Sequence, residues 1–256
     1  MSDVLLSVEG LSLRFAGVRA LTDVSFDVRR GQLFSVIGPN GAGKSSLFNC
    51  ISGVYRPTSG SIRFDGTELV GRAPHRIAKL GIARTFQNVE VFPTMTVLEN
   101  LLLARHHHMR GGVPAGVLWF GRARREEVAA RRAVDRTIDF LGLGDLRHRR
   151  VGSLPHGLQK RVELGRTLAM EPKLLLLDEP VAGMNHDETQ EMVRAIVRAR
   201  QELGIAVVLV EHDMGVVMEI SEEICVLDFG ERIALGAPAD VARDEAVLTA
   251  YLGGAL

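Results

Sequence analysis

Eight consecutive residues carry the most specific chemical pattern in the chain. Residues 38–45 read Gly-Pro-Asn-Gly-Ala-Gly-Lys-Ser, which matches the phosphate-loop pattern G-x-x-x-x-G-K-[ST]. Glycines let backbone N–H groups converge on phosphate oxygens, and the start of a following helix adds its positive end. Lys44 is placed to reach the β- and γ-phosphates, and the Ser45 hydroxyl to ligate Mg²⁺. The pattern predicts a nucleoside-triphosphate site, with a merely flexible turn as the alternative.

Two carboxylates and a histidine follow two later apolar segments. Asp178 and Glu179 come directly after four leucines, at the strand end where ligands collect in open α/β sheets. Asp178 suits Mg²⁺ coordination, directly or through water, whereas Glu179 suits orienting the water that attacks the γ-phosphate. His212 follows the next predicted strand, so we expect it at the same edge as a donor to the γ-phosphate. Taken alone, the two acids would equally suit the cap of a turn, and a single histidine at a strand end is more often an ordinary surface residue.

Hydrophobic periodicity predicts the elements that position these residues. Alternating segments at 4–8, 11–15 and 24–28 predict strands, and 33–37 predicts a short buried strand before the phosphate loop. A helix is expected over 45–52. The later elements are near-continuous apolar strands at 173–177 and 205–210 with a helix at 188–203 between them, and a hairpin of 224–227 with 232–235.

The middle of the chain changes to helical spacing. Residues 97–141 predict a helical insertion, with a Gly/Pro-rich break at 111–114. Gln87 stands at its start, where a neutral amide is placed to reach Mg²⁺ or the attacking water. His106, His107 and His108 cannot all face one way, so a polar helix end is favoured over a metal site.

Composition limits the classes of protein that fit. The 256 residues are 46% hydrophobic, which is enough for a core, and Lys+Arg and Asp+Glu both number 31. A net charge of zero gives no general attraction to nucleic acid. Cys50 and Cys225 are expected to be buried small hydrophobic residues in a reducing cytosol. The N-terminus has no signal-peptide pattern and no segment has the length of a spanning helix, so we expect membrane attachment only through a partner.

One further segment resembles a family signature. Residues 153–169 read SLPHGLQKRVELGRTLA, similar to the signature of ATP-binding cassette (ABC) ATPases. The resemblance covers nearly the whole chain, because the phosphate loop, Gln87, the signature, the acidic pair and His212 follow in the family's order. It implies ATP and Mg²⁺ as ligands. The expected residues are Phe15, which stacks on adenine, with Gly38, Pro39, Asn40, Gly41, Ala42, Gly43, Lys44, Ser45 and Ser46 for ATP; Glu179 and His212 for catalysis; Ser45, Gln87 and Asp178 for Mg²⁺; and Leu154, Pro155, His156, Gly157 and Leu158 for the signature, which acts on the partner's ATP.

The resemblance also implies a fold and a division of the chain. The expected fold is α/β, with a RecA-like P-loop core, an N-terminal antiparallel β subdomain and an inserted α-helical subdomain. A single ABC ATPase domain would span residues 1–256. Residues 1–87 and 166–256 would form the β subdomain and the core, and residues 88–165 the helical subdomain with the signature.

Three shorter sequence segments point to a subfamily. Residues 81–87, 95–100 and 182–185 look like those of the ATPases of branched-chain amino-acid importers, and the insertion resembles the larger of their two ATPase subunits. The implied function is ATP hydrolysis that powers import of branched-chain or related hydrophobic amino acids. The ATPases of urea or amide importers and of lipopolysaccharide exporters share much of the sequence in these segments. A non-transport ABC ATPase fits less well, because the chain has neither a second cassette nor a long coiled coil.

The implied partners are a second ABC ATPase subunit, identical or not, two transmembrane permease subunits and, indirectly, an extracytoplasmic solute-binding protein. The chain would lie peripherally at the cytoplasmic face of the inner membrane. A permease helix is expected to dock at Val89, Val91, Phe92 and Met95, unless these apolar residues form the core of the insertion itself.

The signature departs from the family in one respect. Where the common form has Ser-Gly-Gly-Gln after its Leu, this chain has Pro155, His156, Gly157 and Leu158, and so lacks the Ser hydroxyl. Proline is compatible with a helix start, and the backbone donors and helix dipole can still meet an anion. The departure predicts a weakened composite ATP site in the dimer.

Overall fold

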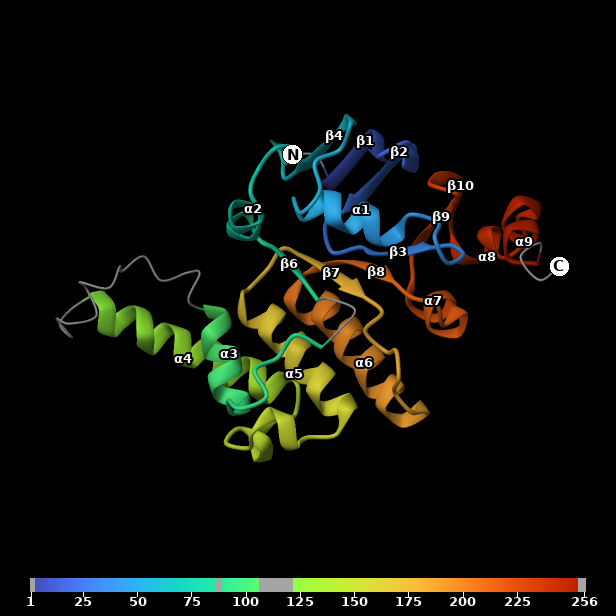
Figure 1. Ribbon diagram of the computed structural model, residues 1–256. Helices are drawn as coiled ribbons and strands as arrows, with labels where there is room; N and C mark the ends of the chain where they lie inside the picture. Colours follow the sequence, from blue (N-terminus) through green and yellow to red (C-terminus); the bar gives the residue numbers. More distant parts are fainter. Residues whose placement is uncertain (1–2, 86–88, 106–121, 253–256) are drawn as a thin grey trace. The chain divides into compact units, whose positions relative to one another are not determined.

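The computed structural model describes residues 3–85, 89–105 and 122–252 (Figure 1). The described chain falls into two compact units. The first is drawn from Met1–Arg84, Lys173–Pro180 and Ile196–Leu256, and the second from Thr85–Pro172 and Val181–Ala195.

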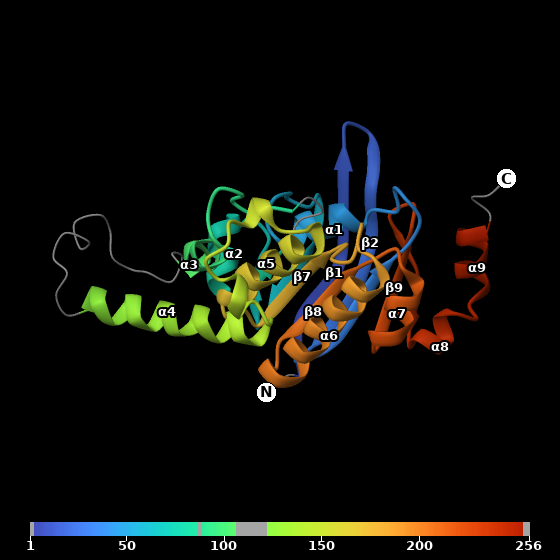
Figure 2. The same cartoon turned by 90° about the horizontal axis from the view of Figure 1, so that it is seen from below.

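The first unit begins with a four-stranded antiparallel sheet in the order β2-β1-β4-β5. Its strands are β1 (Val4–Phe15), β2 (Val18–Arg29), β4 (Ser59–Phe64) and β5 (Thr67–Glu68). Strands β1 and β2 form a long hairpin, as Figure 2 shows. This is the antiparallel β structure that the sequence predicts for the first 70 residues.

One boundary prediction in this sheet was wrong. The segments 4–8 and 11–15 are not two strands but the single strand β1. Gly10 has a φ of 59°, and the register of β1 against β2 shifts between Val8 and Leu11. A residue in the left-handed region can insert a bulge that bends a strand without ending it. The glycine therefore marks an irregularity inside the strand.

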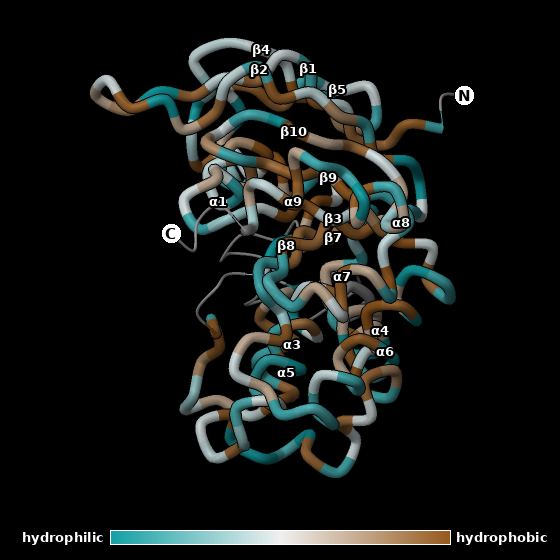
Figure 3. Tube along the Cα trace, turned by 90° about the vertical axis from the view of Figure 1, so that its right-hand side faces the viewer, coloured by the Kyte–Doolittle hydropathy of each residue, from teal (hydrophilic) through white to brown (hydrophobic). Residues whose placement is uncertain are grey.

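A six-stranded sheet forms the other layer of the first unit, in the order β10-β9-β3-β8-β7-β6. Pairing is parallel throughout except between β9 and β10. Its strands are β3 (Leu33–Ile37), β6 (Ile82–Arg84), β7 (Leu174–Asp178), β8 (Ala206–Val210), β9 (Glu223–Asp228) and β10 (Glu231–Gly236). Every residue of β3, β7 and β8 is buried, and Figure 3 shows the hydrophobic character of β3 and β7. This confirms the prediction of parallel strands covered on both faces.

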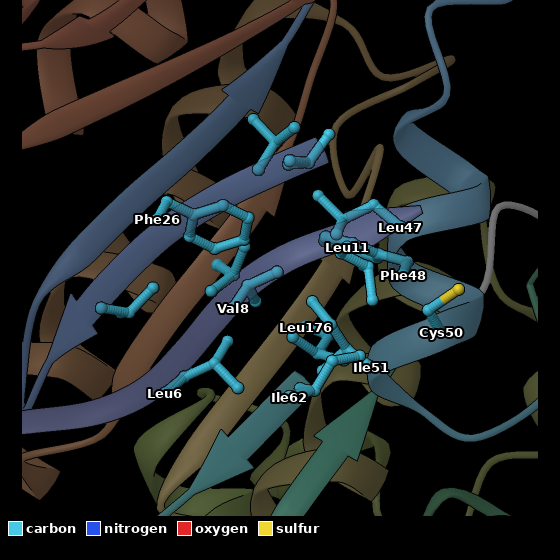
Figure 4. Packing of buried hydrophobic residues seen from close by; sticks show 14 of the residues in the cluster. Leu6, Val8, Leu11, Phe26, Leu47, Phe48, Cys50, Ile51, Ile62 and Leu176 are labelled. Atoms are coloured by element: carbon cyan, nitrogen blue, oxygen red, sulfur yellow. The ribbon is translucent and has the colours of Figure 1, made fainter. Parts of the chain in front are cut away.

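Helix α1 (Lys44–Ile51) joins the two sheets into one core. Its residues Leu47, Phe48 and Ile51 are fully buried and pack with side chains of both sheets, as Figure 4 shows. Burying a large apolar side chain contributes about 1.5–3 kcal/mol. The helix that carries Lys44 and Ser45 is therefore held firmly by its apolar face.

The opposite face of β3 and β9 packs against C-terminal helices. Alternation along the strands sends Val36 into the core shared with α1 and Ile37 into a second cluster. That cluster contains residues of α7 (Met214–Ile220), α8 (Pro238–Val241) and α9 (Glu245–Leu252). A short helix, α2 (Pro74–Leu80), precedes β6.

The second unit is helical. It contains α3 (Val97–Arg105), α4 (Arg122–Phe140), two 3₁₀ turns (Gly144–Leu146 and Val151–Ser153), α5 (His156–Ala169) and the first part of α6 (His186–Leu203). A Cβ at Gly165 would lie 3.0 Å from Leu141 and 3.4 Å from Leu101, so α5 approaches its neighbours closely there. The predicted helical insertion is confirmed; its 111–114 break and His106–His108 lie outside the described residues.

Two further predictions concern membrane and cysteine chemistry. Within the described part of the chain, no helix has the length and apolarity needed to cross a membrane. Cys50 and Cys225 are both free and buried. Burial raises the pKa of Cys50 to about 11 and that of Cys225 to about 12. Both thiols therefore stay protonated and pack as small apolar groups, as predicted.

Candidate nucleotide-binding site

The phosphate loop connects β3 to α1 in a conformation that requires glycine. A Cβ at Gly38, where φ is 149°, would lie 2.0 Å from the carbonyl oxygen of Leu227. A Cβ at Gly43, where φ is 102°, would lie 2.6 Å from the carbonyl oxygen of Ala20. The loop is thus pressed between β9 and the start of β2. Asn40, Gly41 and Ser45 remain exposed on its outer side.

Lys44 is the charged residue within the loop sequence 38–45. Its side chain is almost buried, and Nζ donates hydrogen bonds to the carbonyl oxygens of Gly38, at 2.6 Å, and Pro39, at 2.9 Å. Burial lowers the pKa of the Lys44 ammonium, and the carboxylates of Glu179 and Asp178 oppose that effect. The ammonium is therefore already aimed into the loop, where a phosphate oxygen can replace a carbonyl.

The acidic pair lies at the end of β7, opposite β8. Asp178 pairs with Val210 in the parallel ladder, and the N–H of Glu179 donates to the carbonyl oxygen of Val210 at 2.8 Å. Glu179 has a φ of 49°, a left-handed conformation that turns the chain sharply after the strand. The turn separates the two carboxylates. Asp178 is buried, while the side chain of Glu179 is 17% exposed.

His212 lies beside Glu179. Its Nε2 is 2.8 Å from Oε1 of Glu179, and its side chain is 45% exposed. The two residues follow β8 and β7, which are neighbours in the sheet. The structure thus brings together the histidine and the carboxylate that the sequence places at one sheet edge.

The Asp178 carboxylate has a different environment, because it forms an ion pair with Arg84. Nη2 of Arg84 donates to Oδ2 of Asp178 at 3.0 Å. Burial raises the pKa of the Asp178 carboxyl, the nearby charge of Glu179 acts in the same direction, and Arg84 opposes both.

The residues present fit a magnesium ion. Mg²⁺ at phosphate-transfer sites takes oxygen ligands, usually one or two carboxylates with waters and substrate phosphates. Asp178 and the Ser45 hydroxyl offer that donor set, and no cluster of three or more His, Cys, Asp or Glu residues suited to another metal occurs among the residues described. Gln87, the third predicted ligand, lies outside the described residues.

Phe15 ends β1 and forms part of an aromatic pair. Phe15 is 43% exposed, and its ring meets the ring of Tyr55 edge-on, with centroids 5.0 Å apart and planes at 75°. Tyr55 is itself held by a hydrogen bond from its N–H to the carbonyl oxygen of Asn49 at 2.9 Å. Since Phe15 pairs with Val18, close to the Ala20 that touches the phosphate loop, the pair offers an aromatic platform near the loop.

The signature segment lies in the second unit. Leu154 and Gly157 are buried, whereas Pro155 and His156 are exposed at the start of α5. Pro155 is the N-cap residue and makes no side-chain cap hydrogen bond. A Cβ at Gly157 would lie 2.6 Å from the carboxyl group of Glu188, so a larger residue there would require the Glu188 side chain to move. Leu158 is half-buried.

The expected docking residues lie in the connecting segment before α3, also in the second unit. Phe92 is 43% exposed, while Val89, Val91 and Met95 are half-buried. Asn100 is buried and fixes the backbone of Phe92, accepting from its N–H at 2.9 Å and donating to its carbonyl at 3.0 Å. The guanidinium of Arg166 lies 5.2 Å from the centre of the Phe92 ring.

Sequence reasoning missed three residues around the phosphate loop. Arg84 and Tyr55 are described above. The third is Tyr251 of α9: burial raises the pKa of its hydroxyl, and a hydrogen bond with the Gly38 backbone opposes this. No local pattern marks any of the three, because each acts through a partner distant in sequence.

A glycine-rich loop between a buried parallel strand and a helix, with an acidic pair at the end of another strand of the same sheet, defines a P-loop nucleoside triphosphatase. Comparison with known families narrows this class. The model of the ABC transporter family matches residues 21–182, and that of the branched-chain amino acid ATP-binding cassette transporter matches residues 231–256. The chain therefore belongs to the ABC transporter family, as an ATP-hydrolysing subunit.

Individual relatives match along the full length. The high-affinity branched-chain amino acid transport ATP-binding protein BraF of Pseudomonas aeruginosa is 42% identical over 255 residues, which cover 100% of both chains. The corresponding protein LivG of Escherichia coli is 40% identical over 255 residues, again covering 100% of both. A probable LivG of Archaeoglobus fulgidus is 35% identical over 249 residues, 97% of this chain and 95% of the relative.

Solved structures confirm the fold class. An ATP-binding cassette of an ABC transporter in its ADP conformation has a TM-score of 0.85 at 30% identity, covering 98% of this chain and 100% of that one. A nucleotide-free ATP-binding cassette from an ABC transporter has a TM-score of 0.84 at 30% identity, covering 97% of this chain and 98% of that one.

Proposed function

We propose that this ATPase powers the import of branched-chain amino acids through separate membrane permease subunits. The observation that carries the proposal is the full-length identity of 40–42% to proteins named as branched-chain amino acid transport ATP-binding proteins. The match of residues 231–256 to a family model of the same transporters supports it independently, since these residues lie outside the ABC transporter match.

ATP binding would be divided between the loop and the aromatic pair. The Lys44 ammonium and the N–H groups at the start of α1 would hold the β- and γ-phosphates, and Phe15 would stack on adenine. Because Tyr55 meets Phe15 edge-on, it would keep that ring in place before nucleotide arrives. This arrangement supports recognition of the base and of the triphosphate by different elements.

The hydrolytic step would depend on Glu179 and His212. The Glu179 carboxylate would accept a hydrogen bond from water and orient its oxygen towards the γ-phosphorus, in line with the leaving oxygen of ADP. His212, hydrogen-bonded to Glu179, would hold that carboxylate in place and donate to the γ-phosphate. Such hydrolysis needs mainly positioning and charge stabilisation, so no covalent intermediate with the protein is required.

Asp178, Ser45 and Gln87 would hold Mg²⁺ with the phosphates. When bound, the ion neutralises developing charge on the β- and γ-phosphate oxygens. Asp178 is suited to the ion rather than to proton transfer, because it is buried and engaged by Arg84.

The ATPase would act as a dimer with a second ABC subunit. The outer side of the phosphate loop is exposed, as are Pro155 and His156 at the start of α5. Both surfaces would be covered if each ATP were held between the phosphate loop of one chain and the signature of the other.

We further propose that the chain is one ATPase domain, with 1–87 and 166–256 as β subdomain and core and 88–165 as helical subdomain.

The segment around Phe92 would receive the permease. The backbone of Phe92 is fixed by Asn100, yet the residue is 43% exposed, which supports a preformed contact surface more than an internal core. The chain would then lie at the cytoplasmic face of the membrane. An extracytoplasmic solute-binding protein would act on it only through the permease.

Reconstitution of the whole transporter in proteoliposomes tests this function. The subunit would be assembled with its permeases and partner ATPase, and ATP hydrolysis measured with solute-binding protein carrying leucine, urea or no solute inside the vesicles. We expect leucine-loaded protein to stimulate hydrolysis and leucine to move with the ATP consumed, and the Glu179→Gln variant to abolish both. If only the urea-loaded protein stimulated ATP hydrolysis, or if the amino-acid-loaded protein did not stimulate it, the proposed substrate class would be overturned.

A further inference from the structure

Arg84 is the last residue of β6, and its guanidinium donates hydrogen bonds to Asp178, Asn49 and Ser52. Its Nη2 donates to Oδ2 of Asp178 at 3.0 Å, while Nη1 donates to Oδ1 of Asn49 at 2.6 Å and to Oγ of Ser52 at 3.0 Å. Asn49 lies in α1 and Ser52 caps its C-terminal end. One guanidinium therefore links the helix after the phosphate loop to the carboxylate at the end of β7.

The surroundings of Arg84 are closed. Its side chain is 9% exposed and that of Asp178 is 5% exposed. The guanidinium carbon lies 5.5 Å from the centre of the Phe48 ring, which is itself fully buried in α1. Packing and hydrogen bonds thus hold the guanidinium in one place, and a planar, rigid donor group transmits its orientation to the carboxylate it binds.

The strand register explains why only a long side chain serves here. Arg84 pairs with Leu176 on the neighbouring strand, so Asp178 lies two residues further along β7. The guanidinium must reach past the end of its own strand to meet the carboxylate. The guanidinium carries the positive charge that a buried carboxylate needs as a partner, and it offers several N–H donors in a fixed geometry.

We propose that Arg84 is a positioning residue for divalent-cation binding: held by Asn49 and Ser52 of the α1 segment, it fixes the Asp178 carboxylate in the orientation that ligates Mg²⁺ beside the nucleotide phosphates. This inference rests on the proposed role of Asp178. It adds a specific task for Arg84, which acts through the Asp178 carboxylate. Hydrogen-bonding partners of metal ligands commonly have this task, because a ligand that is already oriented loses less freedom on binding.

A purely structural ion pair makes a different prediction. Loss of such a pair would destabilise the first unit and weaken ATP binding to the same extent with and without metal. A positioning role instead separates the two quantities: affinity for the divalent cation falls, while affinity for metal-free ATP is retained, because Lys44 and the phosphate loop are unchanged.

The test uses the purified full-length chain and Mn²⁺ as a paramagnetic substitute for Mg²⁺. Mn²⁺ affinity in the presence of ATP is measured by electron paramagnetic resonance, and ATP affinity in EDTA by calorimetry. We expect Arg84→Met to weaken Mn²⁺ binding about 10- to 100-fold and to leave ATP binding in EDTA unchanged. Arg84→Lys, which keeps the charge without the planar fork, and Asn49→Ala, which removes one anchor of the guanidinium, are expected to weaken Mn²⁺ binding to a smaller extent.

Arg200→Met is the matched control. Arg200 also lies in the first unit and makes an ion pair with Glu222 and a hydrogen bond to the carbonyl of Gly31, away from the phosphate loop. It should leave Mn²⁺ affinity unchanged. Unchanged Mn²⁺ affinity in folded Arg84→Met would overturn the proposal; if that variant does not fold, unchanged affinity in both Arg84→Lys and Asn49→Ala overturns it. A wild-type chain that binds no ATP with Mn²⁺ would contradict the proposed nucleotide site itself.

Discussion

Nε2 of His212 lies 2.8 Å from Oε1 of Glu179, across the ends of two neighbouring parallel strands. The contact joins residues 33 positions apart in the chain. The contact holds the Glu179 carboxylate in one orientation. In the mechanism we propose, Glu179 is the general base, and a base held in one orientation needs little reorganisation during hydrolysis.

Glu179→Gln should bind ATP but hydrolyse it slowly. The amide keeps the shape of the side chain but cannot act as a general base, so we expect the single-turnover rate to fall by about 10²- to 10⁴-fold. ATP affinity should be retained, and the ATP-bound dimer should accumulate in size-exclusion chromatography. Glu202→Gln, which changes an exposed carboxylate paired with Arg198, is the control. Hydrolysis by Glu179→Gln at the wild-type rate would exclude this residue as the base.

Lys44→Ala should act mainly on nucleotide affinity. Lys44 is buried in the loop and aimed at the phosphate position, and a hydrogen bond to a charged group contributes about 1.5–3 kcal/mol, so a loss of about 10- to 100-fold is expected. Calorimetric titration with ATP measures it. Lys173→Ala removes an exposed lysine that pairs with Asp65 and should leave ATP affinity unchanged. Equal affinities of the Lys44 variant and the wild type would refute the assigned role.

Phe15→Ala should weaken binding of ATP but not of inorganic triphosphate. Stacking of an aromatic side chain on a base contributes about 1–3 kcal/mol, so the dissociation constant for ATP should rise by roughly 5- to 100-fold. Tyr55→Leu removes the edge-on support of the Phe15 ring and should have a smaller effect in the same direction. Inorganic triphosphate serves as the ligand control, because it has no base. A loss of triphosphate binding in either variant would point to a distorted loop instead.

Gly38→Ala should destabilise the protein more than Gly41→Ala. Both glycines have positive φ, but an added Cβ at Gly38 would lie 2.0 Å from a backbone oxygen of β9, whereas nothing lies within 4 Å of the one at Gly41. The cost of overpacking predicts a free energy of unfolding about 1–3 kcal/mol lower for the Gly38 variant than for the Gly41 variant. Urea denaturation of the two variants measures the difference. Equal stabilities would show that the backbone of β9 moves to accommodate the added methyl group at little cost.

Pro155→Ser should raise the ATPase rate of the assembled dimer. Pro155 is exposed at the start of α5 and offers no hydroxyl, whereas a serine there could donate to the γ-phosphate of ATP held by the partner chain. Turnover of the whole transporter with and without this substitution measures the effect. Pro238→Ser, at the start of α8, is the control for replacing a helix-initiating proline. An unchanged rate in Pro155→Ser would contradict a weakened composite site.

Much of the fold follows from local patterns. The apolar segments 33–37, 173–177 and 205–210 predict the buried strands within one residue of their ends, because strands covered on both faces leave a continuous apolar signature. The bulge at Gly10 was not predicted, because only pairing with β2 distinguishes a glycine that bends a strand from one that ends it.

The sequence by itself determined which chemistry the site was predicted to perform. The phosphate loop and the Asp178–Glu179 pair are contiguous motifs, and their residue types and spacing predict binding of phosphate and Mg²⁺ and orientation of a water molecule. Only the tertiary structure decided which side chains support them. Arg84 meets Asp178 at a separation of 94 residues, and Phe15 meets Tyr55 across the β1 end and the loop after α1. Such contacts depend on strand order and packing, which no spacing along one segment encodes.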